Sequence, residues 1–411
     1  MRVLDPVTKE TLSVLEMGDN EAALSVAMVP LRDRAGETFV MVGTVKDMTL
    51  HPKQLTAAYI HCYQFTDGNT RLELVHKTQV EHVSKAPRLH PSPLTLHPSP
   101  LTLHPSPLTL HPSPTPTPSP SPSPPPPPSR SSLSLLQVED VPKALVEFHG
   151  RLLAGVGNRL RLYDMGKQKL LRKCELRGLP TMVHSIHVIS PSRIVVGDLA
   201  ESFHYIKYQR QENSFVLFAD DPAPRWLTAA CVVDANTLAG ADKFGNIFVT
   251  RLPQEVSDDV DDAQILSSAA ANEALALNGA PSKADEIVQY HVGETVTSLQ
   301  KVALGPGNAE VLLYTTLLGG VGALMPLTAK DDLELMQALE MHLRQEAPPL
   351  SGRDQLMYRS SYFPCKGVVD GDFCSQFNML AHDEQKAIAE ELDRTPAEIS
   401  KKLEELANRI M

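Results

Sequence analysis

Three segments of the sequence share one pattern: GVGNRLRLYD at residues 155–164, GDLAESFHYI at residues 197–206 and GADKFGNIFV at residues 240–249. Each contains a glycine that follows an apolar strand, then a polar turn, then a strand in which apolar and polar residues alternate. The segments begin 42 and 43 residues apart, and a fourth, TLLGGVGALM at residues 316–325, follows a longer gap. Four-stranded units that repeat every 40–45 residues or so are typical of β-propeller blades.

The rest of the first 330 residues continues this pattern of short strands. Runs rich in Val, Ile, Phe and Tyr are bounded by Gly, Asn, Asp and Pro, as in Phe39 to Val45 and Ala58 to Phe65. No amphipathic helix of adequate length separates them, which disfavours a parallel α/β sheet. The acidic stretch from Asp258 to Asp262 lacks the glycine and the terminal glutamate of a calcium loop, so we expect a solvated loop there.

The sequence changes character after Pro326. A helix is predicted over Asp331 to Gln345, where apolar residues recur at spacings of three and four. Thr395 to Glu398 read as a capping box with proline at the first helical position. We therefore predict a mainly β fold class, a partial, C-terminal WD40-like β-propeller followed by a small α-helical domain.

A proline-rich stretch interrupts the predicted propeller. The chain has 34 prolines, of which 18 lie between Ser84 and Gln137, and the heptad LHPSPLT occurs three times in succession from Leu89. Proline at this density cannot supply helix or sheet hydrogen bonds. The predicted domains are a propeller over 1–83 and 138–330, a disordered insert over 84–137, and a helical domain over 331–411. Because no strands precede the pair formed by residues 2–4 and 11–15, we expect an N-terminally incomplete propeller.

Composition and motifs exclude several classes of protein. The formal net charge of −11 argues against a protein that holds nucleic acid by its bulk charge. No apolar run is long enough for a membrane span, and the five cysteines include no C-x-x-C pair. Phosphate-binding loops, zinc-protease motifs and nucleophile elbows are also missing. Asp198 and Asp242 are the nearest to a pair of catalytic carboxylates, and both have the sequence context of turn residues. We therefore expect no enzyme and no cofactor.

Two groups of residues are candidates for partner contact. The first is a basic cluster that would touch RNA phosphate or an acidic partner, or would instead protect a sheet edge by charge: Arg159, Arg161, Lys167, Lys169, Arg172 and Lys173. The second is an apolar stripe on the last predicted helix, which would pack on its own domain or dock on a partner subunit: Ile399, Leu403, Leu406 and Ile410.

Several longer segments carry a family resemblance. GADKFGNI from Gly240, FADD from Phe218 followed by PRW, YHVGETV from Tyr290 and EMHLR from Glu340 resemble the C-terminal region of the splicing factor 3b subunit 3 family. PPLSGRD from Pro348 and ELDRTP from Glu391 do the same. A looser pattern is shared with the CPSF A subunit and the large subunit of the damaged-DNA-binding protein.

This resemblance implies a non-catalytic scaffold of the U2 small nuclear ribonucleoprotein, located in the nucleus and acting in pre-mRNA splicing. Its implied partners are the other splicing factor 3b subunits, namely the HEAT-repeat subunit 1, the small subunit 5 and the PHD-finger-like subunit, with at most weak or indirect RNA contact and no membrane. The alternatives are an adaptor for damaged-DNA recognition or ubiquitin ligation, or a polyadenylation-factor propeller, of the same family. A propeller enzyme is the remaining, less favoured alternative.

Overall fold

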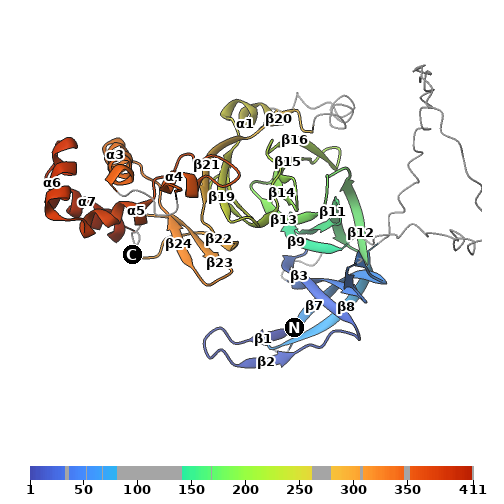
Figure 1. The fold of residues 1–411 in the computed structure, drawn as a ribbon. Helices are drawn as coiled ribbons and strands as arrows, with labels where there is room; N and C mark the ends of the chain where they lie inside the picture. Colours follow the sequence, from blue (N-terminus) through green and yellow to red (C-terminus); the bar gives the residue numbers. More distant parts are fainter. Residues whose placement is uncertain are drawn as a thin grey trace, which may run out of the picture.

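The computed structural model describes residues 1–32, 37–51, 53–66, 68–80, 141–167, 169–261, 279–305, 309–346 and 352–409. The predicted insert over 84–137 lies outside them. The sheets follow one another in chain order along an arc, and the C-terminal helices lie at the end of that arc that carries β24 (Val321–Leu324) (Figure 1). Within the described residues the arc does not close into a ring. The predicted fold class, a mainly β partial propeller followed by helices, is confirmed.

Five sheets make up the arc, and the main ladder in each is antiparallel. The first two sheets have four strands each: β3 (Glu21–Pro30), β4 (Thr38–Lys46), β7 (Ala57–Thr66) and β8 (Arg71–Gln79), then β9 (Pro142–Phe148), β10 (Arg151–Val156), β11 (Arg159–Met165) and β12 (Leu170–Leu176). The third has β13 (Val183–Val188), β14 (Arg193–Asp198), β15 (Ser202–Gln209) and β16 (Ser214–Asp220), with β20 (Ser282–Lys283) pairing in parallel at its edge.

The fourth sheet consists of β17 (Leu227–Val232), β18 (Thr237–Asp242), β19 (Asn246–Arg251) and β21 (Asp285–His291), and the fifth of β22 (Val296–Val302), β23 (Val311–Thr316) and β24. Two small hairpins lie outside the five sheets, β1 (Arg2–Leu4) with β2 (Thr11–Val14) and β5 (Thr49–Leu50) with β6 (Lys53–Gln54). The strand pair predicted at the start of the chain is therefore confirmed.

Hydrophobic cores fill the spaces between successive sheets. One core lies between the first and second sheets. Three more lie between the second and third, the third and fourth, and the fourth and fifth sheets. The recurring glycines explain the close approach, because a Cβ atom at Gly43 of β4 would collide with the Pro142 carbonyl in the first strand of the next sheet. In the same way, a Cβ at Gly155 of β10 would collide with Val183 of β13. Glycines at these two positions therefore let neighbouring sheets approach closely.

The C-terminal helices are α3 (Lys330–Glu346), α4 (Gln355–Arg359), α5 (Gly371–Ser375), the 3-10 turn η1 (Gln376–Met379), α6 (His382–Glu391) and α7 (Pro396–Asn408). All of them except α4, which has no buried residue, share a separate core. The helix predicted over Asp331 to Gln345 is confirmed by α3, and the capping box at Thr395 is confirmed at the start of α7, where Thr395 Oγ1 accepts from the Glu398 N–H at 3.3 Å.

One prediction about local structure is wrong. Of the acidic stretch expected to be a loop, residues 258–261 are helical and belong to α1 (Gln254–Asp261), while Asp262 lies outside the described residues. Val256 and Val260, four residues apart, pack on the core between the third and fourth sheets, and Ser257 Oγ accepts from Arg193 Nη1 at 2.7 Å. This apolar pair gives α1 a buried face even though acidic residues dominate its composition.

Candidate interaction surfaces

The predicted basic cluster lies on the hairpin of β11 and β12, at the outer edge of the second sheet. Part of this cluster converges on one carboxylate, Glu175 in β12. Arg161 Nε donates to Glu175 Oε1 at 2.8 Å, Arg177 Nε to Oε2 at 2.7 Å, and Arg159 Nη1 lies 3.3 Å from Oε1. Burial opposes the charge on Glu175, but the hydrogen bonds from Arg177 and Arg161 prevail and lower its pKa to about 2.

Arg161 does not belong to a surface patch. Its side chain is fully buried, ion-paired with Glu175, and 3.4 Å from the hydroxyl of Tyr163. A guanidinium in this position cannot reach RNA or an acidic partner, so the prediction is wrong for Arg161. It stabilises the hairpin instead, because a buried cation persists only with a partner.

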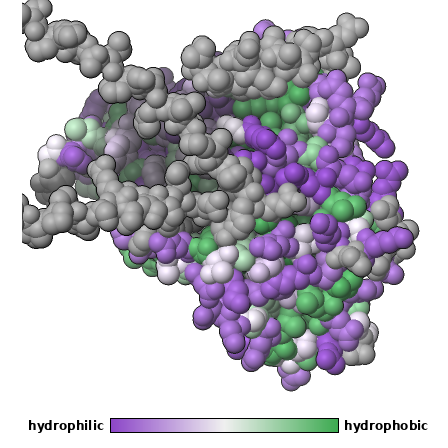
Figure 2. Space-filling view, turned by 90° about the vertical axis from the view of Figure 1, so that its right-hand side faces the viewer, coloured by the Kyte–Doolittle hydropathy of each residue, from purple (hydrophilic) through white to green (hydrophobic). Residues whose placement is uncertain are grey.

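The other four members of the cluster face solvent. Lys167 and Lys169 flank the turn of the hairpin and are exposed, as is Arg172. Lys173 is also exposed and lies 3.7 Å from Asp164. On the side of the molecule that carries β12, hydrophilic side chains surround several hydrophobic patches (Figure 2). The exposed charge is therefore smaller than the sequence suggests, and its contact with RNA or an acidic partner stays a prediction.

The apolar stripe of the last helix is buried within the helical part itself. Ile399, Leu403 and Leu406 of α7 are 1%, 9% and 6% exposed. They pack in one core with residues of α3 and α6, among them Leu339 and Ile388. For these three residues the partner-facing alternative is wrong and packing on the own domain is right, while Ile410 lies outside the described residues. The side chains are simply too well covered by α3 and α6 to offer a docking face.

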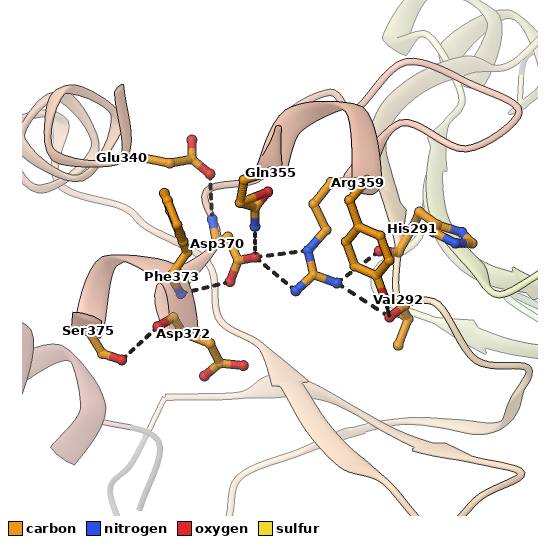
Figure 3. A network of polar contacts seen from close by, with 10 residues as sticks. His291, Val292, Glu340, Gln355, Arg359, Asp370, Asp372, Phe373 and Ser375 are labelled. Atoms are coloured by element: carbon orange, nitrogen blue, oxygen red, sulfur yellow. Dashed lines mark hydrogen bonds and ion pairs between the residues drawn. The ribbon is translucent and has the colours of Figure 1, made fainter. Parts of the chain in front are cut away.

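A polar network joins the helical part to the fourth sheet (Figure 3). Asp370 lies at its centre, with Oδ2 accepting from Arg359 Nε at 2.8 Å and lying 2.8 Å from Arg359 Nη2. The same guanidinium reaches across to the fourth sheet, where its Nη1 donates to the carbonyl of His291 at 3.0 Å. On the other side, the Phe373 N–H donates to Asp370 Oδ1 at 3.1 Å and starts α5. Arg359 thus connects a helix cap to the end of β21.

A second arginine lies beneath this junction. Arg225 is buried between two aromatic rings, 4.0 Å from the centroid of Phe248 and 4.2 Å from that of Phe363. It donates to Gln289 Oε1 at 2.9 Å and pairs with Glu286. Gln289 in turn exchanges two backbone hydrogen bonds of 2.9 Å with Lys366. Residues 352–370 are therefore held against the fourth sheet as a strap.

Sequence reasoning did not identify this junction. Arg225 stands within one of the quoted family segments and Arg359 follows another, but neither spacing indicated a contact between them and the sheet. The signal that could have found them is chemical. The stretch from Tyr358 to Val369 is a poor helix former that still carries an arginine and aromatic rings, a composition suited to packing on a sheet edge.

No catalytic arrangement emerges from the acidic residues considered at the outset. Asp198 Oδ1 accepts from the N–H groups of Ala200 and Glu201, and Asp242 Oδ1 from those of Phe244 and Asn246. Each is the last residue of its strand and accepts hydrogen bonds from the turn that follows, which agrees with their sequence context. Among the described residues, no three His, Cys, Asp or Glu side chains gather as a metal site requires. The described helices include none with the length and apolarity to cross a bilayer.

Comparison with protein families gives a match over residues 1–86 and 132–379 to the CPSF A subunit region. The chain belongs to the CPSF A subunit family. The match leaves out residues 87–131, which lie in the proline-rich stretch. In this family, the chain is 46% identical over its whole length to spliceosome-associated protein 130 A of Arabidopsis thaliana, of which it covers 29%.

Two further relatives carry the name splicing factor 3B subunit 3. The protein of Danio rerio is 43% identical over all of this chain and 29% of its own length. That of Drosophila melanogaster is 38% identical over all of this chain and 28% of its own length. The chain therefore spans less than a third of the length of these curated relatives.

Proposed function

We propose that the chain is a non-catalytic scaffold part of the splicing factor 3b complex, acting in pre-mRNA splicing within the U2 small nuclear ribonucleoprotein in the nucleus. The observation that carries this proposal is similarity along the entire chain to a protein named as spliceosome-associated, at 46% identity, and to two named as splicing factors, at 43% and 38%. A relative that matched only the sheets would support a propeller of any function.

The architecture is suited to a scaffold. Five successive sheets present their turns and outer edges as separate surfaces, while the strap at 352–370 holds the helical part to the fourth sheet. The proposed partners are the other splicing factor 3b subunits: the HEAT-repeat subunit 1, the small subunit 5 and the PHD-finger-like subunit. Because the chain carries a net charge of −11, we expect RNA contact to be weak or indirect.

Affinity purification of the tagged chain from nuclear extract tests the proposal. We expect the three splicing factor 3b subunits to co-purify in stoichiometric amounts. Recovery of a cullin ubiquitin ligase or of polyadenylation factors in their place would assign the chain to another branch of the family. The measurement is quantitative mass spectrometry of the bound fraction, against an untagged extract.

In the same purification, a variant that lacks residues 84–137 tests whether the proline-rich stretch contributes to subunit binding. The stretch holds three copies of one heptad and no acidic residue, and we expect its removal to leave subunit binding intact or stronger. Loss of binding in a deletion variant that keeps its circular dichroism spectrum would contradict this expectation.

A further inference from the structure

A polar cavity of 590 Å³ opens where the first three sheets meet. Its lining comes from the second residue after β3, the turn between β9 and β10 with the first residue of β10, the outer strand β12, and the end of β15 with the turn that follows it. The residues are Arg32, His149, Arg151, Lys173, Tyr208, Arg210 and Asn213. Of the basic cluster predicted from the sequence, Lys173 alone lies in this lining.

Hydrogen bonds between the sheets hold the floor of this cavity in place. Tyr208, which is 6% exposed, donates its hydroxyl to Asn213 Oδ1 at 2.8 Å, and Asn213 Nδ2 donates to the Lys173 carbonyl at 3.1 Å. On the opposite side the Arg32 N–H donates to the Gly150 carbonyl at 2.9 Å. Gly150 has a φ of 69°, and a Cβ atom there would lie 2.9 Å from the Cβ of Arg32, so the turn can approach Arg32 only as glycine.

The charge of the lining is strongly positive. Four of its seven residues are lysine or arginine, and Asp164 pairs with two of them, at 3.3 Å from Arg151 Nε and 3.7 Å from Lys173 Nζ. Arg32 and Arg210 are exposed, and neither pairs with a carboxylate in the part of the chain that the structure describes. Among the described residues, Asp164 is the only carboxylate that ion-pairs with any of these four cations, in a protein whose overall charge is −11. Such a concentration of cations in a concave site attracts anions.

We propose that this cavity binds a compact polyphosphorylated ligand. The volume lies in the range of small-molecule sites, roughly 300–1,000 Å³. Arg32 and Arg210, which have no carboxylate partner among the described residues, suit phosphate oxygens, because these accept paired N–H groups from a guanidinium. A single strand of RNA fits less well, because such strands stack bases on exposed aromatic faces. The ring of Tyr208 is buried and packs against Phe148 and Phe215, with centroids 5.3 and 5.4 Å away.

The test is calorimetric titration of the full chain with inorganic tripolyphosphate at physiological salt. We expect saturable binding that Arg210→Gln weakens about tenfold, the effect of losing one charge-assisted hydrogen bond. Arg32→Gln should act similarly. Lys169→Gln is the matched control, since it removes one exposed cation from the same region outside the lining, and should change the affinity less than about twofold. Circular dichroism establishes that each variant is folded.

Three outcomes would overturn the proposal. One is the absence of saturable heat with the unaltered chain. Another is equal weakening by Lys169→Gln and Arg210→Gln, which would indicate general electrostatic attraction. The third is a ten-nucleotide uridine RNA that binds more tightly than tripolyphosphate and depends on the same two arginines, which would make the cavity part of an RNA path. None of these results bears on subunit co-purification. A failure of the ligand proposal can therefore be distinguished from a failure of the proposed scaffold function.

Discussion

The sheet of β9 to β12 and the C-terminal helices each place one carboxylate among several donors, but only the second network continues to a distant part of the chain. Glu175 gathers Arg159, Arg161 and Arg177 from within a single hairpin and its flank. Asp370 gathers Arg359, which also bonds the carbonyl of His291 in the fourth sheet. The first network stabilises one sheet and the second holds two parts of the molecule together. Similar charged side chains therefore stabilise a single sheet in one network and the junction between the helices and the sheets in the other.

The largest effect should come from the helical side of this comparison. Leu403→Asp places a carboxylate in the core shared by α3, α6 and α7, and we expect a loss of about 4 kcal/mol in the unfolding free energy of the helices. The helical circular dichroism signal should disappear at lower temperature. The fluorescence of Trp226, the single tryptophan, which precedes β17, should keep its transition.

Lys401→Asp is the control for that variant, since it introduces the same residue on the exposed side of α7 and should cost less than about 0.5 kcal/mol. Unchanged stability in Leu403→Asp would mean that the stripe is not buried. Simultaneous loss of both signals would mean that sheets and helices unfold as one unit.

On the sheet side, Glu175→Gln leaves the buried Arg161 without its charged partner. Removing one member of a buried ion pair costs about 3 kcal/mol or more, and we expect a loss of this size in urea unfolding. Asp164→Asn is the comparison, because its partners Arg151 and Lys173 are 26% and 40% exposed, and it should cost about 1 kcal/mol or less. Equal losses would show that burial of Arg161 does not set the strength of the first network.

Breaking the second network should have a smaller effect on stability. Arg359→Ala removes the bonds to Asp370 and to the fourth sheet, and we expect a loss of about 2 kcal/mol. Hydrogen exchange should rise across residues 352–370 and remain unchanged in β9 to β12. Arg353→Ala, at an exposed position of the same strap, should leave the exchange as it was. Faster exchange throughout the sheets would contradict a role confined to the junction.

The last prediction concerns the response of the Glu175 network to acid. The folded pKa of Glu175 is about 2, below its ordinary value of 4.5, so its contribution is fully present above pH 4.5 and is lost as the pH falls towards 2. The difference in unfolding free energy between the unaltered chain and Glu175→Gln should be constant from pH 7 to 5. Below that it should shrink by about 1.4 kcal/mol per pH unit. A difference that stayed constant down to pH 3 would show that the carboxylate is not held by the arginines.

Sequence reasoning succeeded where local chemistry decides the structure. The spacing of Gly155, Gly197 and Gly240 indicated the blades because each glycine lies in the second strand of its sheet. The capping box at Thr395 located the start of α7 because a cap depends on residues within one turn. These features require no knowledge of which distant segment packs against them.

Sequence reasoning failed where strand register, or packing against a distant segment, decides which residues are in contact. The pairing of β11 with β12 shifts between Leu162 and Tyr163, and this irregularity decides that Arg161 lies opposite Glu175. Strict alternation places Arg161 on a charged face and does not reveal its burial. In α1 the two valines that pack on the sheets are outnumbered by acidic residues, so the sequence resembles a loop. The Asp370 network reaches the fourth sheet through Arg359, whose acceptor His291 lies 68 positions earlier in the chain, and no local pattern connects the two.

The strap also constrains the order in which the chain folds. Arg225 becomes enclosed only when Phe248, Glu286, Gln289 and Phe363 have all reached it, and these residues span nearly 140 positions of the sequence. Contacts of such long separation carry a high loop-closure cost and form late. During synthesis, the fourth sheet would be complete before residue 363 emerges from the ribosome, and until then a charged guanidinium and an aromatic face would stand open to water. The contacts between the strap and the fourth sheet therefore form only after the strands of the propeller have been translated.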